Sequence, residues 1–153
     1  MDRDIEVYIT NLRSQDRDLR YQAFLYIQSI TNEKVDWAYD VWDSLKDDLT
    51  HPDNHRRAIA AQLLCNLAKS DPEGRMLSDF SDVLKLTKDK RFVTARHCIQ
   101  SLWKVGLAGK QQKAMLIEGL AERFRNCIEW IETEDDLKYR KNMLRCGNPA
   151  VWK

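Results

Sequence analysis

The stretch Leu19–Ile30 reads LRYQAFLYIQSI, and two later stretches, Arg56–Leu67 (RRAIAAQLLCNL) and Thr94–Val105 (TARHCIQSLWKV), repeat its pattern at steps of 37 and 38 residues. In each stretch the fifth residue is small and the ninth and twelfth are large and apolar, which places all three on one face of a helix. The three sets are Ala23, Ile27 and Ile30; Ala60, Leu64 and Leu67; and Cys98, Leu102 and Val105. Repetition at this interval is typical of stacked helix pairs whose neighbours bury a common core.

A further helix is expected before each of these stretches. Its apolar residues recur at the same interval: Ile5, Tyr8 and Leu12; Trp42, Leu45 and Leu49; and, more loosely, Phe80, Val83 and Leu86. Polar turns that contain Asp join the two helices of each pair, and this Asp can cap the second helix by accepting from its free N–H groups. We therefore expect one domain over residues 1–153, with repeats at about 4–31, 36–69 and 77–108 and an atypical repeat or cap at 110–146.

The turn-plus-helix segments at residues 16–30 (DRDLRYQAFLYIQSI), 51–67 (HPDNHRRAIAAQLLCNL) and 88–106 (KDKRFVTARHCIQSLWKVG) resemble HEAT repeats. In that family an Asp in the turn precedes a helix with a basic residue, a small residue and two aliphatic anchors. The resemblance covers residues 4–109 clearly and 110–146 weakly. It implies an all-α, right-handed α-solenoid of three to four HEAT-like helix pairs, with a non-repeating helical bundle as the alternative. It is specific for fold and does not specify a function.

Composition narrows the class of protein. Of the 153 residues, 43% are hydrophobic and 32% are charged, and no apolar run is long enough to span a membrane. The start, Met1-Asp2-Arg3-Asp4, lacks the apolar region of a secretory signal. The four cysteines show no CxxC pair, which argues against a zinc site. We expect a cytoplasmic protein with reduced cysteines and no membrane partner.

Charge is unevenly distributed along the chain although the net charge is only +1. Residues 1–50 carry six Lys/Arg and eleven Asp/Glu, a net charge of −5, whereas residues 51–153 have a net charge of +6. Such a dipole could steer partners or favour head-to-tail contacts. Random variation among solvated surface charges explains the asymmetry equally well.

No catalytic motif is present, so we expect no catalytic residue, no cofactor, no metal and no small-molecule substrate. One cluster needs separate consideration, because HEAT-like DNA glycosylases use tryptophans and an aspartate on such a scaffold. It resembles them in residue type only, and its tryptophans are better interpreted as packing anchors between repeats. The cluster consists of Trp37, Tyr39 and Trp42 with Asp36, Asp40 and Asp43.

The inner face of the predicted solenoid is the first candidate site. In HEAT-type stacks the second helices line the concave side, and positions three and seven apart on these helices share one stripe. The stripe is mixed and polar and suits an extended peptide; a solvated face without a partner is the other interpretation. Its candidate binding residues are Gln22, Gln62, Asn66, His97, Gln100 and Lys104.

The turns supply a second candidate, an edge that could bind anions because basic side chains adjoin helix N-termini. Its residues are Arg56, Arg57, Lys88, Lys90 and Arg91. Turn charges that serve only solubility are the simpler interpretation.

We expect from these observations a non-enzymatic interaction or scaffold module that binds a protein segment in its concave groove. The alternative is a nucleic-acid-binding or DNA base-repair protein on the same scaffold. A third interpretation is a small regulatory subunit whose last repeat closes against another chain through Trp130 and Trp152.

Overall fold

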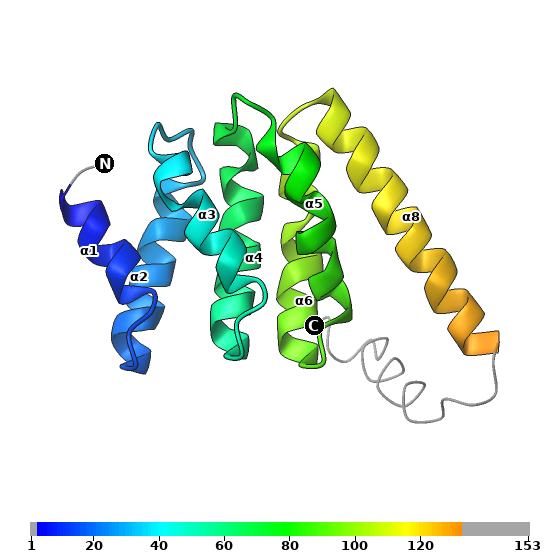
Figure 1. Ribbon diagram of the computed structural model, residues 1–153, viewed down its shortest axis with the longest axis horizontal. Coiled ribbons are helices and arrows are strands. Elements are labelled where there is room, and N and C mark those ends of the chain that lie inside the picture. The colour runs from blue at the N-terminus through cyan, green and yellow to red at the C-terminus, as the bar shows by residue number, and fades with distance from the viewer. Residues whose placement is uncertain (1–2, 133–153) are drawn as a thin grey trace. The chain divides into compact units, whose positions relative to one another are not determined.

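The computed structural model describes residues 3–132, and all regular structure in this range is helical (Figure 1). The elements in chain order are α1 (Arg3–Asn11), α2 (Arg17–Ile30), α3 (Ala38–Asp48), α4 (Asn54–Leu67), the short 3₁₀ helix η1 (Ala68–Ser70), α5 (Arg75–Lys85), the 3₁₀ helix η2 (Leu86–Lys88), α6 (Phe92–Ser101), α7 (Trp103–Gly106) and α8 (Lys110–Glu132). The all-α class predicted from the sequence is confirmed for the described residues. The chain divides into two compact units, Met1–Ile117 and Glu118–Lys153. The expectation of one domain over residues 1–153 stays a prediction.

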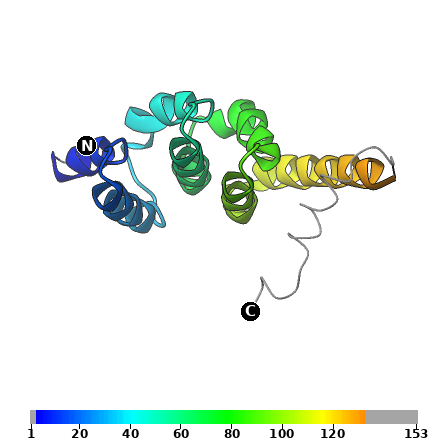
Figure 2. The ribbon, with the colours of Figure 1, turned by 90° about the horizontal axis from the view of Figure 1, so that it is seen from below.

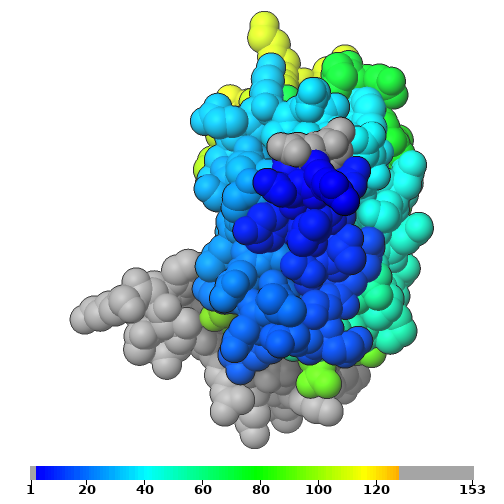
Figure 3. Space-filling view, turned by 90° about the vertical axis from the view of Figure 1, so that its left-hand side faces the viewer, coloured from blue at the N-terminus to red at the C-terminus, as the bar shows by residue number. Residues whose placement is uncertain are grey.

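Within the first unit the helices form two layers. Figure 2 shows α1, α3 and α5 in one layer and α2, α4 and α6 in the other. Helix α4 is the centre of this arrangement, because it contacts α2, α3 and α6. Helices α1 and α2 form the face of the unit on its N-terminal side (blue in Figure 3), where Val7 and Leu25 remain exposed.

An Asp side chain caps α2 and α4, as the sequence predicts. Asp16 accepts hydrogen bonds from the backbone N–H groups of Asp18 and Leu19. Asp53 accepts from the N–H of His55. Each of these two Asp residues satisfies N–H groups that have no partner inside the helix, so each fixes where its helix starts. Helix α6 has no side-chain cap, because the backbone N–H from which Asp89 accepts is that of Arg91, the residue before the helix.

The core consists of the residues that define the sequence repeat. The small residues Ala23, Ala60 and Cys98 are at most 1% exposed, so the helices approach closely at these points. The aliphatic residues one turn later, Ile27, Leu64 and Leu102, are each 1% exposed. Helices α3 and α5 contribute further core residues: Val41, Trp42, Leu45, Met76, Phe80 and Val83.

Helix α8 begins at the start of the range expected for the atypical repeat or cap, residues 110–146. Its first turns belong to the first unit, where Leu116 is 7% exposed. Gly106 permits this packing, because a Cβ at that position would lie 2.8 Å from Leu116 Cδ2. The rest of the range, residues 133–146, lies outside the described residues.

Candidate binding groove

A groove of about 640 Å³ crosses the layer of α2, α4 and α6. Figure 2 shows the reason: α4 is set back between α2 and α6, so the two outer helices form walls and α4 forms the floor. All the lining residues lie in the first nine residues of their helices. They are Arg17, Arg20, Tyr21 and Phe24 on α2; Asn54, His55, Ala58, Ile59 and Gln62 on α4; and Val93, Thr94 and His97 on α6. We call this set the α2–α4–α6 groove.

The lining of the groove carries cationic and imidazole groups and no carboxylate. Arg17 is exposed, and Arg20 donates from Nη1 to the carbonyl of Ser14 at 2.8 Å, which holds its side chain beside the turn. The three helices begin at the same end of the unit (Figure 1), so the positive ends of their dipoles lie together. The groove therefore combines positive charge on its α2 wall and at the helix starts with a floor that carries both polar and apolar side chains.

His97 is the most enclosed titratable group of the groove. Burial lowers the pKa of His97, and the charge of the neighbouring Arg96 lowers it further. The ring is therefore neutral at pH 7, when it can both donate and accept a hydrogen bond. The neutral imidazole of His97 on the α6 wall and the amide of Gln62 on the floor are polar groups that suit a peptide backbone.

Of the predicted stripe, the structure brings Gln62 and His97 together in the groove. Gln62 donates from Nε2 to the carbonyl of Ala58 at 3.0 Å, which leaves its amide oxygen available to the groove. Gln22 and Gln100 are exposed outside the lining.

Asn66, also predicted for the stripe, is 1% exposed and bridges three helix pairs. Its Nδ2 donates to the carbonyl of Gln28 at 3.1 Å and to Thr31 Oγ1 at 3.0 Å, and its Oδ1 accepts from Lys104 Nζ. Buried polar atoms satisfied in this way hold the pairs in register. Asn66 is therefore unavailable to a ligand, and Lys104 is half-buried against it.

The residues of the predicted anion-binding edge differ in their exposure to solvent. Lys88, Lys90 and Arg91 are exposed. Arg56 is half-buried and bonded to Asp48 and to the ring of His51. Arg57 is 6% exposed and forms an ion pair, so its charge is not presented at the surface.

The Arg57 ion pair links two successive turns. Arg57 Nε and Nη2 donate to the two carboxylate oxygens of Asp89 at 2.7 and 3.0 Å, and Nη1 donates to the carbonyls of His51 and Pro52. Burial by itself would raise the pKa of Asp89, but the bonds from Arg57 and from the N–H of Arg91 outweigh it and hold the pKa below its usual value. Both side chains are less than a tenth exposed, so the pair is a structural contact between repeats.

This lowered pKa predicts how stability depends on pH. A carboxyl whose folded pKa is below its unfolded value stabilises the fold above the unfolded pKa, and this stability is lost as the pH falls through the folded pKa. We therefore expect the free energy of unfolding to decrease below about pH 4. Urea titrations at pH 7 and pH 3 should show a smaller decrease for Asp89→Asn than for the wild type. The exposed Asp82→Asn should retain the wild-type decrease, and an equal decrease for Asp89→Asn would contradict the assignment.

The tryptophans of the cluster are part of the core, whereas its aspartates, Asp36, Asp40 and Asp43, are exposed. Trp42 is fully buried and donates from Nε1 to Asp79 Oδ2 at 2.9 Å, and Trp37 is 5% exposed. Tyr39 donates to Asp71, whose carboxylate also accepts from the first backbone N–H groups of α5. These contacts join α3 to α5, as expected for packing anchors.

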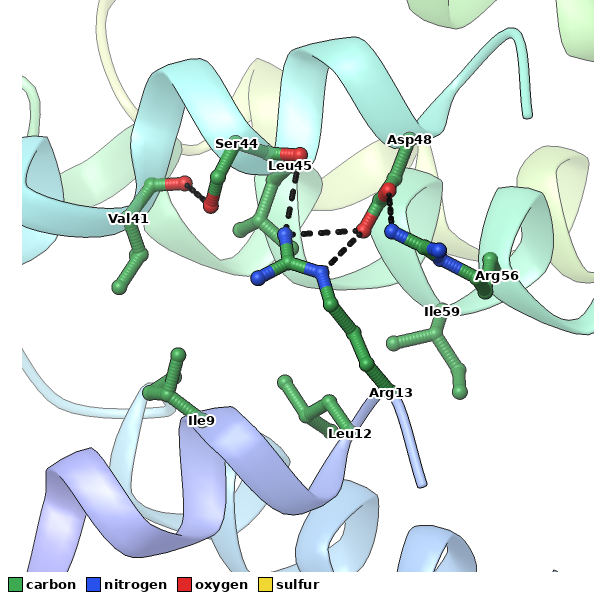
Figure 4. A pocket seen from close by; sticks show the side chains of 9 residues that line it. All are labelled: Ile9, Leu12, Arg13, Val41, Ser44, Leu45, Asp48, Arg56 and Ile59. Atoms are coloured by element: carbon green, nitrogen blue, oxygen red, sulfur yellow. Dashed lines mark hydrogen bonds and ion pairs between the residues drawn. The ribbon is translucent and has the colours of Figure 1, made fainter. Parts of the chain in front are cut away.

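The small hollow between α1, α3 and α4 is likewise structural. It encloses only about 10 Å³, too little for a ligand. Figure 4 shows the carboxylate of Asp48 between the guanidinium groups of Arg13 and Arg56. Arg13 also donates to the carbonyl of Ser44, so this cluster ties the first helix pair to the second.

Sequence analysis missed the α2 wall and the first turns of α4 and α6. Arg17, Arg20, Tyr21 and Phe24 are spaced three, one and three residues apart, which places them on one face of a helix. That spacing was the available signal. The groove lies about one turn closer to the N-terminal ends of the helices than the predicted stripe does.

Among residues 3–132 no group of three or more His, Cys, Asp or Glu side chains is arranged to hold a metal ion. Cys65 and Cys98 are buried, and burial raises the pKa of the Cys98 thiol to about 12. No described helix is both long enough and apolar enough to cross a bilayer. No model of a known protein family matches the chain, and no curated protein matches it either.

Proposed function

We propose that the protein is a non-enzymatic interaction module that binds a segment of a partner protein in the α2–α4–α6 groove. The observation that carries the proposal is the groove itself. Its volume of about 640 Å³ lies within the range of ordinary ligand sites. Its walls combine aromatic and aliphatic side chains with amide and imidazole groups, a mixture that suits a short extended peptide.

We further propose that the helix pairs form a right-handed HEAT-like solenoid. The support is that equivalent bonds recur between successive pairs at intervals close to the sequence repeat. Asn66 bonds to Thr31 and Lys104 bonds to Asn66, at separations of 35 and 38 residues. Thr94 Oγ1 donates to the carbonyl of Asn54, 40 residues earlier. A scaffold of this kind needs no cofactor, and we place it in the cytoplasm.

A nucleic-acid-binding protein is the second candidate. The observation that favours it is the exposure of Lys88, Lys90 and Arg91 on one turn, close in sequence to the α6 wall. The base-repair version has less support, because Trp37 and Trp42 are buried and cannot stack on an extruded base. The regulatory-subunit interpretation depends on Trp130 and Trp152, whose side chains lie outside the described residues.

Two tyrosines on α2 provide a matched test. Tyr21 lines the groove and is 61% exposed, whereas Tyr26 stacks on Tyr8 and does not line it. Peptides selected from a random display library against the full chain should bind Tyr21→Ala at least about tenfold more weakly than wild type, since an interfacial tyrosine contributes strongly. Tyr26→Ala should bind them normally. Affinities would be measured by fluorescence anisotropy.

The reverse pattern, or equal binding by both variants, would exclude the groove. Failure to select any peptide, combined with binding of labelled DNA that weakens steeply with salt, would favour the nucleic-acid candidate. In that case Lys90→Glu with Arg91→Glu should abolish the DNA binding.

A further inference from the structure

We infer that the segment bound by the α2–α4–α6 groove is acidic: an extended peptide with two or more carboxylate groups beside an apolar side chain. This inference rests on the proposed function and specifies the chemistry of its partner. Its basis is the distribution of charge in and around the groove.

The cationic groups of the groove are the guanidinium groups of Arg17 and Arg20 on α2. His55 on α4 and His97 on α6 add imidazole rings that can donate hydrogen bonds, and no lining residue is acidic. A carboxylate bound here would face a guanidinium or imidazole group on each wall and on the floor. Charge-assisted hydrogen bonds of this kind are stronger than neutral ones.

The carboxylates at the starts of the three helices bond elsewhere than to the arginines of the lining. Asp16 and Asp53 accept backbone N–H groups at the starts of α2 and α4. Asp89 is paired with Arg57. None of these three carboxylates forms an ion pair with Arg17 or Arg20, so both guanidinium groups of the lining can donate to a ligand.

Apolar contact is the second requirement on the occupant. Tyr21, Phe24, Ile59 and Val93 supply apolar surface between the charged groups. Tyr21 and Val93 are 61% and 49% exposed, so this surface is open to a ligand. A free inorganic anion would leave it uncovered, whereas a peptide with an aliphatic or aromatic residue between its acids would cover it.

A peptide fits the surroundings better than a nucleic acid. A nucleic-acid backbone carries a charge on every nucleotide and continues beyond the groove, where it would meet the acidic N-terminal part of the chain. Residues 1–50 have a net charge of −5, and Asp16 and Asp18 are exposed at the start of α2. A short segment with a few acids would bind the cations without extending onto this surface.

The test uses the full chain and three fluorescein-labelled ten-residue peptides that share one Phe and two Leu. One carries four Glu, the second has Gln in their place, and the third has two phosphoserines and two Gln. We expect the Glu peptide to bind at least about tenfold more tightly than the Gln peptide in near-physiological salt. Binding of the phosphoserine peptide that is tighter than that of the Glu peptide would overturn the choice of carboxylate in favour of phosphate.

Variants then locate the charge preference. Arg17→Gln with Arg20→Gln should reduce the ratio of acidic to neutral affinity at least fivefold, because these two cations line the groove. The matched control, Lys88→Gln with Lys90→Gln, removes charge from an exposed turn outside it and should keep the wild-type ratio. Circular dichroism of each variant establishes that the helices are intact.

Equal binding of the acidic and neutral peptides overturns the inference. It is also overturned if the control double variant lowers the ratio of acidic to neutral affinity as much as the groove double variant does. A ten-nucleotide single-stranded DNA that binds more tightly than any peptide overturns it in favour of nucleic acid. If neutral peptides bind in a Tyr21-dependent way without any charge preference, the inference fails while the proposed function stands. If library selection yields no Tyr21-dependent peptide at all, the proposed function itself fails.

Discussion

Replacing Arg57 with methionine is expected to lower the free energy of unfolding by about 3 kcal/mol, because it leaves the buried carboxylate of Asp89 without its partner. Both side chains of this pair are less than a tenth exposed. The carbonyls of His51 and Pro52 lose a donor in the same variant. Methionine retains the apolar stem of arginine, so the loss reports mainly on the charge and its hydrogen bonds. Urea denaturation followed by tryptophan fluorescence would measure it.

A double variant separates the ion pair from the packing around it. Arg57→Met combined with Asp89→Leu should recover most of the lost stability, since two apolar groups can replace a buried pair at little cost. Lys85→Met, which removes an exposed pair with Asp82, should change the midpoint little. If Arg57→Met lowers the free energy of unfolding no more than Lys85→Met does, the ion pair of Arg57 and Asp89 does not hold the two turns together.

Replacing Trp42 with alanine should have the largest effect of any single substitution on α3. Trp42 is fully buried, and truncation of such a residue typically costs about 3–5 kcal/mol through lost contacts and the cavity that remains. The variant also removes the donor to Asp79 and so weakens the contact between α3 and α5. Thermal melting followed by circular dichroism would show a much lower midpoint or a partly unfolded chain.

Trp103 is the natural control, because its side chain is 57% exposed. Trp103→Ala should leave the melting midpoint within a few degrees of the wild type. The melting midpoint of Trp42→Phe should lie between those of the two alanine variants, since phenylalanine keeps most of the packing but cannot donate a hydrogen bond to Asp79. Similar midpoints for Trp42→Ala and Trp103→Ala would contradict the placement of Trp42 in the core.

The helices and the core could be predicted from the sequence, because both follow from periodicity. Ala60 and Leu64 sit at fixed places in a pattern that recurs after 37 or 38 residues, and such residues must face a common interior. The capping role of Asp16 and Asp53 was equally accessible, since it depends on local sequence alone. These predictions required no knowledge of how one helix pair is rotated against the next.

The site was harder to predict, because it depends on that rotation. Asn66 and Arg57 are polar residues at positions that sequence alone assigns to the surface, yet each is buried by a partner more than 30 residues away. The groove in turn includes Arg17 and Tyr21, which become neighbours of His97 only because α4 is set back between α2 and α6. Polar residues with distant partners carry no periodic signal.

The contacts of Asn66 have a consequence for how the array of repeats can vary. Asn66 and Lys104 occupy the same place in two successive copies, and Thr31 lies two residues beyond that place in the first copy. Each of the three offers a different chemistry: Thr31 a hydroxyl, Asn66 an amide that both donates and accepts, and Lys104 an ammonium group that only donates. The copies are therefore not interchangeable. A shuffled order, or a slip by one pair during folding, could set two donors against each other in a buried place. The apolar residues of the repeats would tolerate several orders of the copies. These three polar side chains thus restrict the chain to a single order.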